Sequence, residues 1–311
     1  MPDTSTESPP ALGIAAVERE TGIAKDTLRV WERRYGFPQP GRDASGDRAY
    51  PVGQVELLRW IKRLLDAGHR PARVVPLPAQ ALEALIKDTF AKSPAEAADP
   101  ALQAVAPYVE QLRRHQADAL HQTLSLDVLR LGLSRFVTDV VSPLSAAVGD
   151  AWMRGELQVH EEHLYTEIIQ RVLRAAITAA SRGDAVPGRP RVLLATIPQE
   201  PHTLGLLMAE AIMVLEGCHC VQIGAQVPIG DIVAACDAHA ADVLALSFSA
   251  LLQPAQVLEA LGELRTRLPA KVSLWAGGGS PALARAPRGV EVMKDFAALA
   301  LQAREWTRSA A

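Results

Sequence analysis

The spacing of apolar side chains changes along the chain and predicts two kinds of architecture. Between residues 101 and 181, apolar positions such as Leu120, Leu124 and Val128 recur at near-helical spacing, and strand-forming residues are few. This part predicts a bundle of about four helices. From residue 191 onward, short apolar runs alternate with helical stretches. That alternation is typical of an α/β, Rossmann-like, doubly wound parallel sheet, whose ligands lie at the carboxyl ends of the strands.

The alternating region divides into separate predicted elements. Strands are expected at residues 192–195, 220–223, 243–247 and 271–276, and helices at 204–216, 229–238 and 254–264. The segment before them, RGDAVPGRP at 182–190, is rich in proline, glycine and charge, which is typical of a linker.

Residues 13–50 have the pattern of two short helices joined by a tight turn. Gly22 supplies the turn, and Asp26 or Thr27 caps the second helix. Pro38 and the residues after it interrupt helix, so a loop or wing is expected there. The pattern predicts a winged helix-turn-helix, whose second helix fits the major groove of DNA.

These breaks predict a multidomain chain. The expected parts are a disordered tail at 1–11, a winged helix-turn-helix at 12–78, a helical bundle at 79–182, a linker at 183–190 and a Rossmann-like domain at 191–311. No sustained heptad follows Leu77, so dimerisation through a long coiled coil is not expected and assembly is assigned to the C-terminal half.

Composition excludes several classes of protein. With 49% hydrophobic and 22% charged residues the chain fits a globular protein, and no apolar run reaches the roughly 20 residues of a membrane span. The polar start lacks a secretory signal, so we expect a cytoplasmic protein. Cys218, Cys220 and Cys236 have no disulfide or metal-site spacing and are expected to be reduced, buried thiols.

The net charge of −3 conceals an uneven distribution. Between Lys25 and Arg73 there are eleven basic and six acidic residues, an excess of five positive charges. A basic region of this size is the electrostatic footprint of a module that binds double-stranded DNA.

The stretch TLRVWERRYG at residues 27–36, with the arginines and tyrosine after it, closely resembles the MerR family of regulators, whose pattern is TLRxWERRYG and a wing with R...R.Y. Some of these arginines have the alternative of pairing with Glu32 or Asp47 on a solvated face. By the resemblance, the DNA contacts are expected at Arg29, Arg33, Arg34, Tyr35, Arg42, Arg48 and Tyr50.

An ordered set of motifs follows the predicted strands: EPHTLG at 200–205, Ser247 and Ser249 in LSFSA, and the glycines of LWAGGGS. The set resembles the cobalamin-binding domain of methionine synthases and mutases. The resemblance implies His202 as the lower axial cobalt ligand and Glu200 as its hydrogen-bond partner. The remaining cofactor-binding residues implied are Gly205, Ser247, Ser249, Gly277, Gly278 and Gly279.

The helical region carries a second motif, WMRGELQVHEEH at 152–163. It resembles the upper-face motif of the light-sensing cobalamin-dependent repressors of the CarH and LitR kind, which implies that Trp152, Glu162 and His163 cover the adenosyl group. Those repressors have a histidine after the tryptophan, whereas this chain has Met153, a weaker ligand for oxidised cobalt. His160 replaces that histidine only if the helix turns it inward.

Together the resemblances imply a non-enzymatic, cobalamin-dependent transcriptional regulator: a light-responsive repressor that uses adenosylcobalamin and binds a DNA operator as a cofactor-dependent dimer or tetramer. Met153 keeps open a regulator that senses cobalamin, with this or another upper ligand, without light. A corrinoid methyl carrier is a further alternative, although a substrate-activation domain is missing. A corrinoid domain kept only for assembly is disfavoured by Glu200, His202 and Gly205.

Overall fold

The computed structural model describes residues 11–43, 45–89, 99–181 and 189–309. The chain forms two compact units, Met1–Ser93 and Pro94–Ala311. The predicted tail at 1–11 lies outside the described residues except for Ala11, which begins a strand. The predicted linker at 183–190 lies outside them except for its last two residues.

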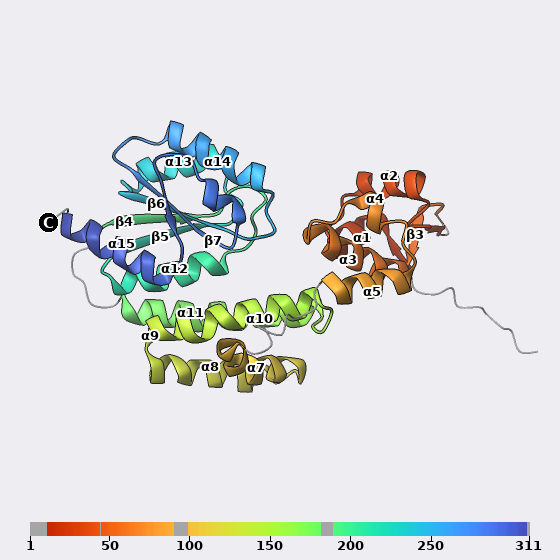
Figure 1. The fold of residues 1–311 in the computed structure, drawn as a ribbon, viewed down its shortest axis with the longest axis horizontal. Helices are drawn as coiled ribbons and strands as arrows, with labels where there is room; N and C mark the ends of the chain where they lie inside the picture. Colours follow the sequence, from red (N-terminus) through yellow and green to blue (C-terminus); the bar gives the residue numbers. More distant parts are fainter. Residues whose placement is uncertain (1–10, 44, 90–98, 182–188, 310–311) are drawn as a thin grey trace, which may run out of the picture. The chain divides into compact units, whose positions relative to one another are not determined.

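The first unit combines helices with a small antiparallel sheet (Figure 1). Its elements are β1 (Ala11–Gly13), α1 (Ile14–Thr21), α2 (Lys25–Tyr35), β2 (Gly41–Arg42), β3 (Arg48–Pro51), α3 (Val52–Asp66), α4 (Pro71–Val74) and α5 (Ala79–Thr89). Gly22 ends α1 with a left-handed φ of 67° and Gly36 ends α2 with 70°, a conformation that favours glycine. β2 and β3 pair to form the wing, so the predicted winged helix-turn-helix is confirmed.

The core of the first unit extends further along the chain than the sequence suggested. Leu28 of α2 and Tyr50 of β3 lie in this core, and Leu82 and Ile86 of α5 belong to it as well. The predicted boundary of the DNA-binding domain was residue 78. In the structure α5 is part of the first unit because its apolar face packs against α3.

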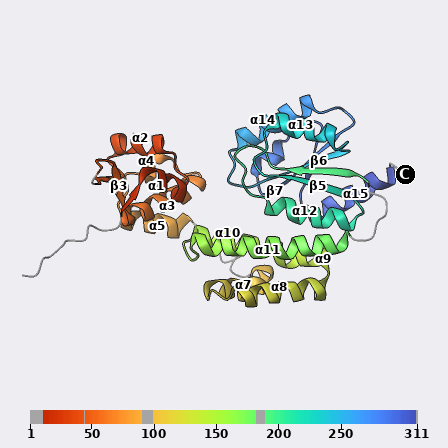
Figure 2. The ribbon, with the colours of Figure 1, turned by 180° about the vertical axis from the view of Figure 1, so that it is seen from behind.

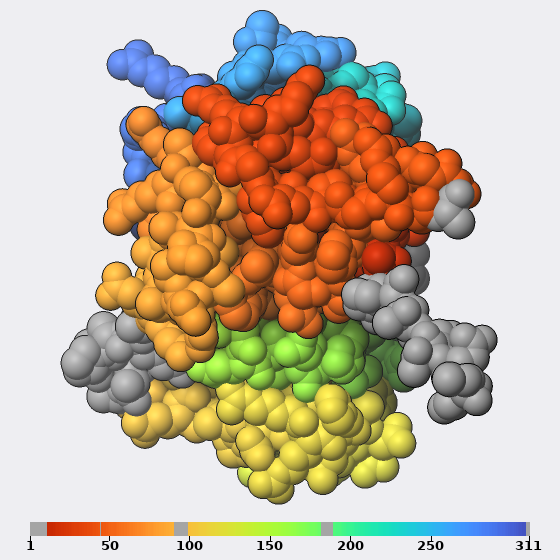
Figure 3. All heavy atoms as spheres, turned by 90° about the vertical axis from the view of Figure 1, so that its right-hand side faces the viewer, coloured from red at the N-terminus to blue at the C-terminus, as the bar shows by residue number. Residues whose placement is uncertain are grey.

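The second unit begins with the helical bundle. Its elements are α7 (Pro100–Arg113), α8 (Ala117–Leu131), α9 (Leu133–Arg135), the π-helical η1 (Phe136–Val141), α10 (Ser142–Met153) and α11 (Val159–Ala180). Because α9, η1 and α10 follow one another directly, the described residues form four helical segments, as predicted. Figure 3 shows the yellow part of the bundle, which contains α7 and α8, packed against its green part.

The rest of the second unit is an α/β domain. Its elements are β4 (Arg191–Ala195), α12 (Leu204–Leu215), β5 (His219–Gly224), α13 (Ile229–Ala238), β6 (Val243–Phe248), α14 (Pro254–Arg267), β7 (Ser273–Gly278), η2 (Pro281–Arg285), β8 (Val290–Met293) and α15 (Phe296–Ser309). The described strands form one parallel sheet in the order β5-β4-β6-β7-β8. The predicted strands and helices are confirmed, whereas β8 and α15 were not predicted.

Helices cover both faces of this sheet, with α12 and α15 on one face and α13 and α14 on the other (Figures 1 and 2). The bundle lies on the α12 side, where α11 packs along α12. Leu173 of α11, Leu206 of α12 and Trp275 of β7 belong to one hydrophobic core. The bundle and the α/β domain are therefore held together by a shared interior.

Candidate functional site

A cavity of about 430 Å³ opens at the carboxyl edge of the parallel sheet. Its walls are the loop before α12, the ends of β6 and β7, the residues after β8 and the start of α15, and Ser142 of the bundle also lines it. Doubly wound sheets bind their ligands at this edge. The predicted residues that line the cavity are His202, Gly205, Ser247, Ser249, Gly277, Gly278 and Gly279.

Glu200 organises the loop that carries His202. Its side chain is completely buried. Oε1 accepts hydrogen bonds from His202 Nδ1 at 2.5 Å and from the His202 backbone N–H at 3.1 Å, and Oε2 accepts one from the Ser249 backbone N–H at 2.7 Å. With Nδ1 donating to the carboxylate, Nε2 is the imidazole nitrogen suited to bind a metal.

The charge of Glu200 is maintained by these contacts. Burial raises the pKa of the Glu200 carboxyl, but the hydrogen bonds from His202 and Ser249 lower it by more, so the pKa lies below its ordinary value. Glu200 is therefore an anion at neutral pH, which fixes the tautomer and direction of the His202 ring.

The glycines at this edge differ in how much space surrounds the position of a Cβ atom. A Cβ on Gly278, whose φ is +112°, would lie 2.2 Å from the Phe248 carbonyl oxygen, and a Cβ on Gly205 would lie 2.4 Å from Ser247 Oγ. The nearest atoms to a Cβ at Gly277 and Gly279 are 3.5 and 3.7 Å away, which is ordinary contact. Gly278 is thus required by the backbone, whereas a side chain at Gly205 would have to displace the Ser247 hydroxyl.

Several residues that line the cavity were missed by the sequence analysis. Lys294, Asp295 and Phe296 follow β8 and reach the same edge as His202. The alternating stretch VEVM at 290–293 is the signal that identifies this strand and, with it, the polar residues at its end. Trp275, buried in β7, also lines the cavity.

The second predicted group lies at the end of α10 and the start of α11, outside this cavity. Trp152 packs half-buried against the shared core. His163 Nδ1 is 2.7 Å from Glu162 Oε2, while Glu162 Oε1 accepts a hydrogen bond from the Thr166 hydroxyl at 2.9 Å. Met153 is half-buried. In Figure 1 this end of the bundle extends past the start of α12, toward the carboxyl edge of the sheet.

In the first unit, α2 presents the predicted recognition side chains. Arg33 and Arg34 are exposed, and the Arg34 guanidinium lies 5.4 Å from the centre of the half-buried Tyr35 ring. Arg29 is paired with Asp26 at 2.9 Å. In the wing, Arg42 is exposed and donates to the Gly46 carbonyl at 2.8 Å.

Glu32, which the sequence analysis offered as an alternative partner of the arginines, connects the wing to α2. Arg48 Nε donates to Glu32 Oε2 at 3.0 Å, and the Tyr50 hydroxyl donates to Glu32 Oε1 at 2.7 Å. Tyr50 is fully buried. A DNA contact through the Tyr50 side chain does not fit this burial. Arg48, whose side chain is 32% exposed, pairs with Glu32 and stays a predicted DNA contact. Both residues join the wing to α2 through Glu32.

The cysteines behave as predicted. Cys218 and Cys236 are buried and Cys220 is partly buried, and none is bonded to another. Burial raises the pKa of Cys218 to about 12 and that of Cys236 to about 11, so both thiols are protonated at neutral pH.

Comparison with known proteins assigns a family to each part. Residues 12–77 match the model of the MerR HTH family regulatory proteins, and residues 101–177 and 190–298 each match a B12 binding domain. The chain belongs to the MerR-type regulators that carry B12-binding domains. The resemblances drawn from the sequence are thereby confirmed.

Two transcriptional repressors are similar to this chain over most of its length. The chain is 30% identical to the HTH-type transcriptional repressor CarH of Myxococcus xanthus over 83% of this chain and 86% of the relative. It is 29% identical to the repressor CarA of the same organism over 80% and 81%. The monomethylamine corrinoid protein of Methanosarcina barkeri, 14% identical, covers 64% of this chain and 96% of its own with a TM-score of 0.52, which shows a shared fold.

The site fits the cofactor that this family implies. A buried carboxylate orients an imidazole at a cavity of about 430 Å³, and Gly278 allows two backbone segments to approach closely beside it. The protein is a MerR-type, DNA-binding transcriptional regulator that binds cobalamin. Among the described residues, no helix is both long and apolar enough to span a membrane.

Proposed function

We propose that this protein is a light-responsive, non-enzymatic repressor that uses adenosylcobalamin as its chromophore. The observation that carries the proposal is the Glu200–His202 pair at the cavity, with the end of α10 extending toward the same edge. When bound, adenosylcobalamin supplies a cobalt–carbon bond that light cleaves. The names of the relatives CarH and CarA support repression as the output.

Each group of residues has a distinct part in this proposal. His202 Nε2 would bind the cobalt, and Glu200 keeps the ring in the required tautomer. Gly205, Gly278 and Ser247 line the cavity that would hold the nucleotide tail. Trp152, Glu162 and His163 would cover the other side of the cofactor, where the half-buried indole would exclude water.

The state of the cofactor is coupled to DNA binding through the assembly of the protein. A homo-oligomer, dimer or tetramer, brings DNA-binding modules together on an operator, with Arg33 and Arg34 of α2 in the major groove and Arg42 of the wing on the phosphates. The intact cofactor favours the oligomer if it binds that state more tightly than the separated chains. Once the cofactor is no longer intact, this preference would be lost and the repressor would leave the DNA.

The test measures cofactor binding and oligomeric state in the same samples. Full-length protein and His202→Ala are incubated with adenosylcobalamin in the dark, and absorption spectra and light-scattering mass are recorded before and after green illumination. We expect the wild type to bind the cofactor, to form an oligomer in the dark and to lose mass in the light. His202→Ala changes the spectrum and weakens binding, whereas His219→Ala, an exposed histidine of β5, serves as the matched control.

A cobalamin sensor that works without light is the second candidate, favoured by Met153 in place of the histidine of light-sensing repressors. An oligomer that depends on adenosylcobalamin but keeps its mass under green light identifies this candidate. Equal mass and DNA affinity with and without cofactor refute both.

A further inference from the structure

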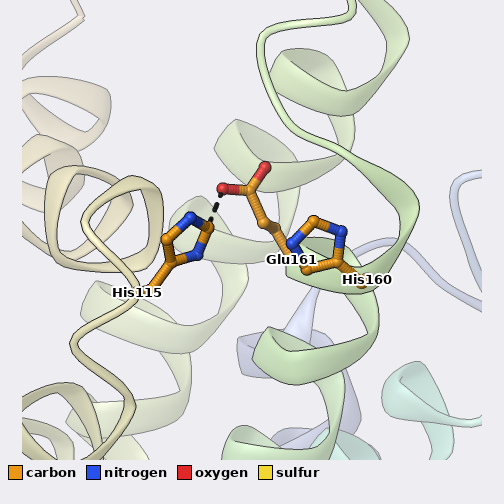
Figure 4. A group of neighbouring side chains, drawn as sticks. All are labelled: His115, His160 and Glu161. Carbon is orange, nitrogen blue, oxygen red and sulfur yellow. Dashed lines mark ion pairs between the residues drawn. The ribbon is translucent and has the colours of Figure 1, made fainter.

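Two imidazoles and one carboxylate converge at the end of the bundle where α7 turns into α8 and α11 begins (Figure 4). They belong to His115, in the turn after α7, and to His160 and Glu161, in the first turn of α11. One ligand atom from each lies within 4.8 Å of the others. Among the His, Cys, Asp and Glu side chains of the described residues, these three form a group with the spacing of metal ligands.

The Glu161 carboxylate is held in place from one side. Glu161 is buried, with 6% of its surface exposed, and its Oε2 accepts a hydrogen bond from the Gln158 backbone N–H at 2.6 Å in a capping box. Its Oε1 is 3.7 Å from His115 Nδ1. One carboxylate oxygen thus completes the helix start, and the other faces an imidazole.

His115 is held by the backbone of its turn. Gln116 N–H donates to the Gln111 carbonyl and His115 N–H to the Leu112 carbonyl, the arrangement that closes a helix with a left-handed residue. His115 is that residue, with φ 54°, where glycine is the usual choice. Its ring stacks on His160 with centroids 5.8 Å apart.

We propose that His115, His160 and Glu161 bind a divalent transition-metal ion, with Zn²⁺ as the ion of best fit. Two imidazoles and a carboxylate are a donor set that Zn²⁺ accepts, with water in the fourth position. Ligand bonds of about 2.0–2.1 Å in a tetrahedron put donor atoms roughly 3.3 Å apart. The 3.7 Å between His115 Nδ1 and Glu161 Oε1 is close to this value, and one ligand atom of His160 lies within 4.8 Å of both other residues.

The two arginines beside His115 are paired with carboxylates outside the cluster. Arg114 pairs with Glu110 at 2.7 Å, and Arg113 pairs with Glu156 at 2.6 Å, a carboxylate that it shares with Arg154. The metal would join the α7–α8 turn to the first turn of α11. Glu162 and His163 follow Glu161 directly, so the ion would also steady the segment that carries them.

The experiment is a calorimetric titration of ZnCl₂ into untagged, chelator-treated, cobalamin-free full-length protein. We expect one Zn²⁺ per chain with micromolar affinity, weakened at least about tenfold in His115→Asn, His160→Asn and Glu161→Gln, since each loses one ligand. Asparagine tolerates the left-handed backbone at 115, and glutamine can keep the capping box at 161. His239→Asn, which removes an exposed histidine at the end of α13, is the control and retains the wild-type affinity.

The proposal is overturned if the wild type does not bind Zn²⁺, or if the three cluster variants bind it as tightly as the wild type. It is also overturned if affinity falls in His202→Ala and not in the cluster variants, because zinc then occupies the Glu200–His202 pair. Circular dichroism of each variant confirms the fold, and His115→Asn with His160→Asn decides the matter if Glu161→Gln is poorly folded.

Discussion

The α/β domain and the helical bundle each contain a carboxylate–imidazole pair, and the two pairs differ in what surrounds them. Glu200 Oε1 is 2.5 Å from His202 Nδ1, and Glu162 Oε2 is 2.7 Å from His163 Nδ1. The Glu200 side chain is 1% exposed and also accepts two backbone N–H groups, whereas the Glu162 side chain is 33% exposed and accepts one hydroxyl.

This difference separates a preorganised site from one that is completed by its ligand. A buried, ionised carboxylate with backbone donors has one low-energy arrangement, so it fixes its imidazole before any cofactor arrives. An exposed pair is worth little by itself because water competes for both groups. We therefore expect the Glu200 pair to hold its ligand permanently, and the Glu162 pair to make contacts that form and break with the state of the cofactor.

The largest expected effect comes from the strand end beside the Glu200 pair. Gly278→Ala brings a Cβ against the Phe248 carbonyl and imposes a side chain at φ +112°, so we expect a loss of about 3 kcal/mol in the free energy of unfolding. Gly277→Ala, one residue earlier, meets only ordinary contacts and should cost about 1 kcal/mol or less. Urea denaturation measures both, and equal losses would show that this edge is not rigid.

The sequence predicted the strands and helices around this edge well, because each is encoded by local periodicity. The helix at 229–238 coincides with α13, and the motif residues His202, Gly205 and Ser247 line one cavity. β8 was missed because it is a short run, and its residues Val290–Met293 are all only partly buried.

The geometry of partnerships between distant positions could not be predicted, although Glu32 was offered as an alternative partner of the arginines. Glu32 meets Arg48 and Tyr50 only because the wing folds back on α2, across 16 and 18 residues. His115 meets His160 because two helix ends lie side by side. Neither pairing leaves a periodic signal in the sequence, since it depends on tertiary packing.

Exchanging each carboxylate for its amide tests the comparison directly. Glu200→Gln removes the charge that orients His202, so cobalamin affinity should fall 10- to 100-fold, or about 1.4–2.8 kcal/mol. Glu162→Gln is the matched change in the exposed pair, and we expect less than about a threefold loss. Spectroscopic titration with hydroxocobalamin gives both values. Equal losses in the two variants would refute the distinction between the pairs.

A histidine at position 153 should strengthen the binding of the cofactor by the helical bundle. Imidazole is a better ligand for oxidised cobalt than a thioether, so Met153→His should slow the release of cobalamin after illumination by about tenfold relative to the wild type. Met153→Leu, which removes the sulfur and keeps the apolar character, is the control. Gel filtration after timed green light follows the release, and identical rates for all three proteins would show that residue 153 does not reach the cofactor.

The smallest expected effect is at Trp152, which is half-buried against the shared core. Phenylalanine keeps an aromatic ring there but covers less surface. Trp152→Phe should therefore weaken the binding of adenosylcobalamin about threefold, or roughly 0.7 kcal/mol. Hydroxocobalamin has no adenosyl group for the indole to cover, and its affinity should stay unchanged. Dark titrations with both cobalamins make the measurement. Equal weakening of both would mean that Trp152 only supports the bundle, and the bundle side would then have no contact specific for the adenosyl group through this residue.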